Sequence, residues 1–440
     1  MRTKSSIESV TSLRSFVAPS SRSSAIPARL ALGTFLATAC FAGANALGGC
    51  GSSGSDGTAD SGASAPTNEV GKPPAKPSAA KTTATVQKTF AFRQLFLGDT
   101  DRTLAPVENG WRKLGYNLDG KVTTKGATDV CKPVTGGSVT ADGENGIDNA
   151  FGEKIVPSLG IVPGFGQPSR TISQSLNDGA FTIMLSIVGL DDSPTQTNTG
   201  LTGQLFAGGQ FDPAATDKKP TWSGSDVWPV RGELLVDGKT IAGGSRVVFN
   251  DSYVSNGTWV NGTSGDVTLT LAINGVPLVI NVRNAVITGA HTQPGKLENG
   301  IVAGVVRATE LIDAIKNVVG RFTTAACPGS ALFNTLAQSI QQAADMRADG
   351  TTDGECDSLS VALGFTAELV ANPTVVGPAQ EPTPDACSAD GGTDAATGDA
   401  SVTDSAVTDS GSTDARPDAV GNDGESDAAA VGDASDGGTG

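Results

Sequence analysis

Residues 266–287 read DVTLTLAINGVPLVINVRNAVI, and this stretch decides the fold class. Apolar side chains alternate with other residues on both sides of Asn274-Gly275. A period of two places the apolar side chains on one face of a strand. The Asn-Gly pair suits a tight turn because both of its residues readily take positive φ. The stretch therefore predicts an antiparallel β-hairpin with one buried face.

Other parts of the chain carry related patterns. Apolar runs that alternate or are continuous predict strands at TFAFRQLFL (89–97), FTIMLSIVGL (181–190) and SLSVALGFTAELV (358–370). Helical spacing predicts one helix between an N-cap at Thr309 and Gly320, a second between a cap at Ser330 and Gly350, and a shorter one at 169–179. Many strands with a few late helices predict a mainly β (α+β) fold. The core is expected to be an antiparallel β-sandwich or barrel-like, with two or three helices.

The two ends of the chain differ in composition from its middle. Residues 50–88 are rich in Gly, Ser, Pro and Ala, and residues 388–440 repeat Asp among Ala, Gly, Ser and Thr. Both segments have too few large apolar side chains to offset the entropy of ordering, so we expect a disordered linker and a disordered acidic tail. The segment between them, 89–387, is expected to form one β-rich globular domain.

The first 49 residues have the pattern of a secretory signal peptide. Five basic residues and one acid lie among them, and the run LALGTFLATACFAGANAL (30–47) has no charge. A membrane-spanning helix needs roughly 20 strongly apolar residues. This run is shorter and rich in small residues, so cleavage of 1–49 is the prediction.

Leu47-Gly48-Gly49-Cys50 resembles the bacterial lipobox, in which the Cys becomes the lipidated N-terminus. The resemblance implies that Cys50 carries acyl chains, and two or more of these hold a protein on a membrane essentially permanently. Ordinary cleavage that leaves Cys50 as a free thiol is the alternative. Gly51 follows the lipidated position, where Asp retains enteric lipoproteins on the inner membrane, so the outer membrane or cell surface is the expected location.

Charge excludes one class of partner. The net charge is −16, and removal of residues 1–49 makes it −20. A chain of this charge repels nucleic acid, so we expect no DNA or RNA partner.

Four cysteines remain after Cys40 leaves with the signal peptide and Cys50 is lipidated. An even number in an exported protein predicts two disulfides, and no Cys-x-x-Cys pair supports a zinc site. Of the three possible connectivities, we favour Cys327 with Cys356 and Cys131 with Cys387.

Few residues suggest metal or catalytic chemistry. The only histidine, His291, lies in the loop sequence TGAHTQPG and is expected to be solvated. Asp142, Glu144, Asn145 and Asp148 supply oxygen ligands at a density that suits Ca²⁺, although turn chemistry explains them equally well. No other cofactor is predicted.

Four aromatic residues are close in sequence: Trp222, Trp228, Tyr253 and Trp259. Exposed rings of this kind stack on sugars, so they are a candidate ligand platform. Burial in the core is the simpler alternative.

Three segments carry a wider resemblance: DGENGIDNAFGEKI (142–155), WPVRGELLVDGKTIAGGSRVVF (228–249) and VTLTLAINGVPLVI (267–280). With them, residues 89–387 resemble uncharacterised predicted lipoproteins of myxobacteria, a resemblance that implies no activity. We expect a surface binding or structural module, not an enzyme, whose ligand is a glycan, a peptide or a lipid. The alternatives are a polysaccharide hydrolase that uses a carboxylate pair and a lipid carrier with an apolar cavity.

Overall fold

The computed structural model describes residues 71–160, 166–212, 218–273, 276–321, 323–378 and 387. Nine strands form the sheet. They are β1 (Gln87–Phe96), β2 (Thr182–Val188), β3 (Asn198–Gly208), β4 (Val247–Ser255), β5 (Thr258–Val260), β6 (Gly265–Ile273), β7 (Val276–Ala290), β8 (Lys296–Arg307) and β9 (Ser358–Val370).

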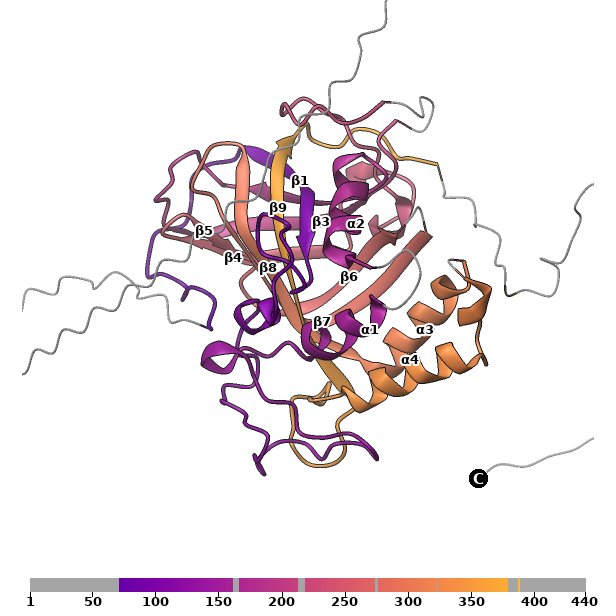
Figure 1. The fold of residues 1–440 in the computed structure, drawn as a ribbon. Helices are drawn as coiled ribbons and strands as arrows, with labels where there is room; N and C mark the ends of the chain where they lie inside the picture. The colour runs from indigo at the N-terminus through magenta and orange to yellow at the C-terminus, as the bar shows by residue number, and fades with distance from the viewer. Residues whose placement is uncertain are drawn as a thin grey trace, which may run out of the picture. The chain divides into compact units, whose positions relative to one another are not determined.

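Eight of these strands close into an antiparallel barrel. The sheet order is β5-β4-β3-β2-β1-β9-β8-β7-β6, and β5 also pairs with β7, which closes the ring without β6. The first and last strands are neighbours, and Figure 1 shows the indigo β1 beside the yellow β9. The mainly β fold is thus confirmed, and of the two architectures left open by the sequence the barrel is the one that forms.

The hairpin at 266–287 is present as β6 and β7, while its turn residues 274 and 275 lie outside the described residues. The strand β7 has 15 residues and serves two purposes. Its first part pairs with β6, and Thr288–Ala290 pairs with β5 along the same edge. One long strand therefore joins the hairpin to the barrel wall.

Every second side chain of a strand points inward, and these side chains fill the barrel interior. Phe92 of β1 stacks on Phe365 of β9, with ring centroids 4.0 Å apart. Gly300 makes room for this pair, because a Cβ there would lie 2.4 Å from the Phe365 ring. The large fully buried side chains include Phe90, Phe92, Phe365, Trp259, Leu185 and Ile183. They occupy the space in which a lipid carrier would hold its ligand.

The helices are α1 (Val156–Leu159), α2 (Pro168–Asn177), α3 (Ala308–Val319) and α4 (Ala331–Gln342). Ser330 caps α4 as expected, since its side chain accepts a hydrogen bond from the Phe333 backbone N–H. Two boundaries were predicted wrongly: α3 begins after Arg307, with Thr309 inside it, and α4 ends well before Gly350.

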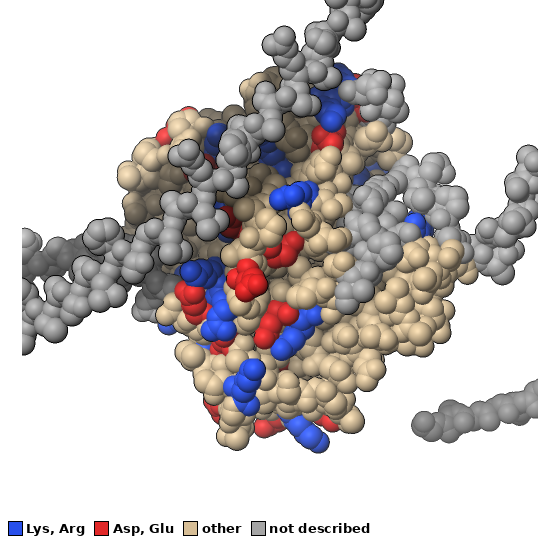
Figure 2. Space-filling model, viewed as in Figure 1, with Lys and Arg blue, Asp and Glu red and all other residues tan. Residues whose placement is uncertain are grey.

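The surface over α3 and α4 differs from the rest of the visible face. The two helices lie side by side in Figure 1. The sequence of α4, ALFNTLAQSIQQ, has no charged residue, and Figure 2 shows an extended uncharged area over this pair. None of the helices in the described ranges is long and apolar enough to cross a membrane.

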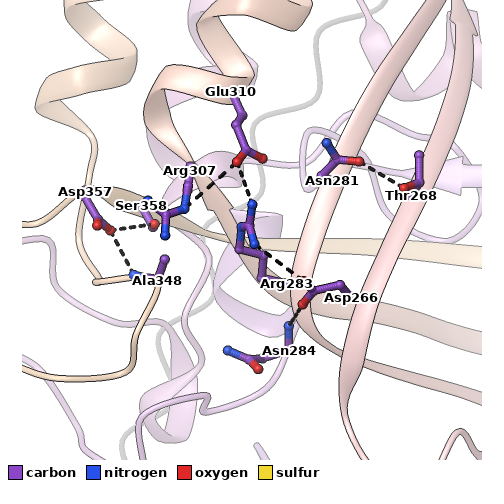
Figure 3. A network of polar contacts seen from close by, with 10 residues as sticks. All are labelled: Asp266, Thr268, Asn281, Arg283, Asn284, Arg307, Glu310, Ala348, Asp357 and Ser358. Atoms are coloured by element: carbon purple, nitrogen blue, oxygen red, sulfur yellow. Dashed lines mark hydrogen bonds and ion pairs between the residues drawn. The ribbon is translucent and has the colours of Figure 1, made fainter. Parts of the chain in front are cut away.

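A polar network fastens the hairpin to α3, as Figure 3 shows. The Arg283 guanidinium of β7 contacts Glu310 of α3 at 2.6 Å and Asp266 of β6 at 3.5 Å. Nearby, the Asp357 carboxylate accepts hydrogen bonds from the Ala348 backbone N–H and the Ser358 hydroxyl. These contacts fix the loop before β9 against the end of the barrel.

Residues 71–86 pack against the outside of the barrel, and we call them the N-terminal strap. The Thr82 backbone N–H donates to the Thr199 carbonyl of β3 at 2.8 Å. The Tyr253 hydroxyl of β4 donates to the Pro74 carbonyl at 2.5 Å.

The expected disordered linker at 50–88 is therefore wrong for its second half. Residues 71–86 form the strap, and Gln87 and Lys88 belong to β1. Residues 50–70 lie outside the described residues. The composition rich in Pro, Ala and Lys misled the prediction because backbone groups, not apolar side chains, hold much of this segment.

The four cysteines form two disulfides, as predicted, but the favoured pairing is wrong. The bonds join Cys131 to Cys356 and Cys327 to Cys387. The first attaches the loop after β1 to the loop before β9, and the second attaches Cys387 beside α4. Helix flanking, on which the predicted pairing rested, carries no information about which loops meet in the barrel.

Candidate functional site

A cavity of about 450 Å³ lies beside Cys131. Five parts of the chain supply its wall: the N-terminal strap at Pro73, the loop after β1, Ser264 before β6, the paired strands β7 and β8, and the loop after α4. Its polar lining includes Tyr116, Asn117, Asp119, Lys121, Asn284, Asp345, Arg347 and Thr351. We call it the aspartate pocket.

Asp345 lies in the turn after α4, and the packing of β9 holds it inside the protein. One carboxylate oxygen accepts a hydrogen bond from the Ser360 backbone N–H at 2.7 Å, and the other accepts from the Ser360 hydroxyl at 2.6 Å. Burial raises the pKa of Asp345 to about 7, because a charged carboxylate loses its hydration there. The side chain is therefore partly protonated near neutral pH.

Two further aspartates lie directly behind the pocket. Asp148 is 3% exposed and accepts a hydrogen bond from the Leu118 backbone N–H at 2.6 Å. Burial, together with the negative charges of Asp345, Asp142 and Asp119, raises the pKa of Asp148 to about 9. Burial also raises the pKa of Asp142. A cavity of about 20 Å³, large enough for a single water molecule, lies among these four carboxyl groups.

The basic side chains of the pocket already have partners outside its lining. Lys121 contacts the Asp129 carboxylate at 3.2 Å, and Arg347 contacts Asp349 at 2.7 Å. Asp119 accepts a hydrogen bond from the Lys121 backbone N–H at 2.8 Å, and no basic side chain in the described ranges forms an ion pair with it. Uncompensated negative charge therefore faces the pocket.

The four residues of the calcium candidate separate into two groups. Asp142 and Asp148 turn inward and meet Asp345, whereas Glu144 points outward and lies 3.6 Å from Lys113. Asn145 takes a left-handed conformation, with φ 58°, inside a turn. Among the described residues, no group of three or more His, Cys, Asp or Glu side chains is arranged to hold a metal ion.

The four aromatic residues do not form an exposed platform. Trp228, Tyr253 and Trp259 are buried, so the expectation of a ligand surface fails for them. Trp222 is half-buried, and the Arg93 guanidinium lies 5.4 Å from its ring centroid. These rings instead pack the barrel and the segment that covers its outer face.

His291 is also buried, contrary to the expected solvated loop position. It is 1% exposed, its Nδ1 lies 2.8 Å from the Lys296 carbonyl oxygen, and its ring meets Phe90 edge-on. The turn that precedes β8 folds over this end of the barrel. The loop composition alone did not reveal that burial.

The lipobox residues Leu47, Gly48, Gly49 and Cys50 lie outside the described residues. Of the other predicted positions, Cys131 lies in the pocket lining, and Cys356, Asp142 and Asp148 line the small cavity behind it. Cys327 and Cys387 are bonded to each other beside α4. Asp119 and Asp345 were missed, because no local motif marks either of them and only the fold brings them together. Comparison of the chain with protein-family models, curated proteins and solved structures finds no significant match.

Proposed function

We propose that the chain is a lipid-anchored protein of the bacterial cell envelope, and that its barrel is a surface module that binds a polar, amine-bearing ligand. The lipobox-like sequence before Gly51 supports attachment through Cys50 and a location on the outer membrane or cell surface. Two disulfides are typical of proteins that leave the reducing cytoplasm.

One observation carries the proposed binding activity. Asp119 and Asp345 line a pocket whose basic side chains, Lys121 and Arg347, are each paired with an acid elsewhere. A ligand with an ammonium group would supply the missing positive charge, and the hydroxyl and amide groups of the lining would bind its other polar atoms. A short glycan that contains amino sugars has both features.

The anchor is tested by metabolic labelling with a palmitate analogue in the bacterium of origin. The wild-type chain should incorporate the label, and the Cys50→Ala variant should not. Equal labelling of the two chains, or no labelling of the wild-type chain, would contradict lipid attachment at Cys50.

The ligand class is tested by calorimetry on the mature chain with Cys50→Ala, which removes the acylation site. Glucosamine oligomers should bind more tightly than N-acetylated oligomers of the same length, because acetylation removes the positive charge. Asp119→Asn should weaken binding by about tenfold, the loss of one charge-assisted hydrogen bond. The matched control is Asp178→Asn, since Asp178 pairs with Lys219 at 2.8 Å away from the pocket. Equal affinity for both oligomers would contradict the proposal.

A polysaccharide hydrolase is the second candidate, and the pKa of Asp345 favours it. A carboxyl group with a pKa of about 7 in a pocket wall is suited to donate a proton to a leaving group. Asp119 in the same lining would be the second carboxylate. Release of reducing ends from envelope polysaccharide, lost in Asp345→Asn, would support this function, and absence of release by the wild-type protein would end it.

A further inference from the structure

A second cavity, of about 510 Å³, lies on the outer face of the barrel between α2 and the strands β1, β8 and β9. We call it the helix–strand groove. Its wall includes three basic side chains, Arg93, Arg170 and Lys296, and two acidic ones, Glu298 and Glu368. Figure 2 shows that basic and acidic side chains are interspersed on the face that carries these elements. An excess of basic residues is notable in a chain with a net charge of −16.

Arg93 is a fixed part of the groove. Its Nη1 donates to the Glu368 carboxylate at 2.5 Å, and its Nε donates to the Asn177 side-chain oxygen at 3.1 Å. The ring of Trp222 lies against the same guanidinium. The charge of Arg93 is therefore balanced within the protein, and its position is set by three neighbours.

Arg170 and Lys296 present positive charge that the protein does not balance. Both are exposed, one on α2 and the other at the start of β8. Arg170 donates to the Leu104 carbonyl oxygen at 3.0 Å, and neither side chain has an ion pair within the described ranges. Lys296 stands opposite Glu368 in the β8–β9 register without reaching it. The two cations face one groove from different elements.

Planar amide groups line the same groove as the two cations. The Thr366 hydroxyl donates to the Gln94 side-chain oxygen at 3.1 Å, so the amide hydrogens of Gln94 remain free to donate. The Asn177 oxygen is taken by Arg93, which leaves the Asn177 amide hydrogens free as well. Glu298 supplies an acceptor at the same wall. Donors and acceptors in this mixture match the hydroxyl groups of a sugar.

We propose that the helix–strand groove binds a glycan whose sugars carry carboxylate groups, with Arg170 and Lys296 on the carboxylates and the amides on the hydroxyls. The groove is separate from the aspartate pocket, and the opposite charge of its ligand distinguishes the two sites. This binding goes beyond the proposed function and does not depend on it.

The test uses the mature chain with Cys50→Ala and calorimetric titration with trigalacturonate. The acidic trisaccharide should bind at least about tenfold more tightly than neutral trigalactose. Arg170→Gln and Lys296→Gln should each weaken its binding by about five- to tenfold, because each removes one charge-assisted hydrogen bond. Both side chains are exposed, so the variants should keep the wild-type thermal midpoint.

Two matched controls accompany these variants. Lys218→Gln removes a basic side chain that pairs with Asp212 at 3.0 Å outside the groove, and it should leave binding unchanged. Asp119→Asn, in the aspartate pocket, should also leave trigalacturonate binding unchanged.

Four results would overturn the proposal. The first is equal binding of the neutral trisaccharide, and the second is absence of trigalacturonate binding. The third is equal binding of an oligo-aspartate peptide, since this result would assign the groove to acidic peptides. Loss of trigalacturonate binding in Lys218→Gln would show that charge in general, not the groove, attracts the ligand.

Discussion

Replacement of Asp345 by Asn should flatten the dependence of stability on pH. In the native protein the pKa of Asp345 is about 7, against 3.8 for an ordinary aspartate. The native state thus holds this proton more tightly than the unfolded state. The resulting stabilisation is complete below about pH 4 and is lost as pH rises through 7.

The size of the effect follows from the shift in pKa. A difference of about three units, at about 1.4 kcal/mol per unit, corresponds to about 4 kcal/mol as an upper estimate. Asp148 acts in the same direction up to about pH 9, where its own pKa lies. The wild-type protein should therefore be several kcal/mol less stable at about pH 9 than at about pH 5.

The assay is urea unfolding of the oxidised protein at about pH 5, 7 and 9. At about pH 5, Asp345→Asn and the wild type should differ by at most about 2 kcal/mol, because Asp345 is still neutral in the native protein and only the unfolded carboxyl group has ionised. At about pH 9 the variant should be the more stable protein. Asp101→Asn is the control, since hydrogen bonds from Thr103 and Ala105 lower the pKa of Asp101 and move its effect below this range. The same slope in the wild type and in Asp345→Asn would refute the reasoning.

Three further outcomes are expected. Phe92→Ala should lower the free energy of unfolding by about 3–5 kcal/mol, since it removes one of the two stacked rings of the core, and urea titration measures this loss. Replacement of Cys131 and Cys356 by Ser should cost about 2–5 kcal/mol by the same assay, and peptide mapping of the wild type should recover these two cysteines in one linked peptide. Trypsin should cut after Lys81 only slowly in the native protein, and Tyr253→Phe should speed this cleavage, because the strap then loses a hydrogen bond worth about 1 kcal/mol. Rapid wild-type cleavage at this bond would show that the strap is not docked.

Local pattern predicted those elements whose own side chains carry the signal. The hairpin of β6 and β7 alternates strictly, and β9 was placed with its observed bounds. The strands β3 and β8 were missed because glycines interrupt the alternation, three of them in NTGLTGQLFAG and two in KLENGIVAGVVR. Gly300 in β8 is explained only by the Phe365 ring on the neighbouring strand.

The candidate site was much less predictable than the fold. Asp142 and Asp148 were singled out for their density in the sequence, but their partners Asp119 and Asp345 come from distant segments. The early end of α4 also depends on a contact with a distant segment, so the local sequence could not predict it. The Met346 backbone pairs with Ser358 at the start of β9, so a tertiary contact, not a local stop signal, turns the chain there.

The pairing of β1 with β9 has a consequence for the order of events during biogenesis. One edge of β1 stays open until residues 358–370 have been synthesised, because no other strand occupies that position in the ring. The Cys131–Cys356 bond spans 225 residues and awaits the same late segment. Closure of so long a loop is slow compared with local hairpin formation. The barrel must therefore close late, only after residues 358–370 have been synthesised.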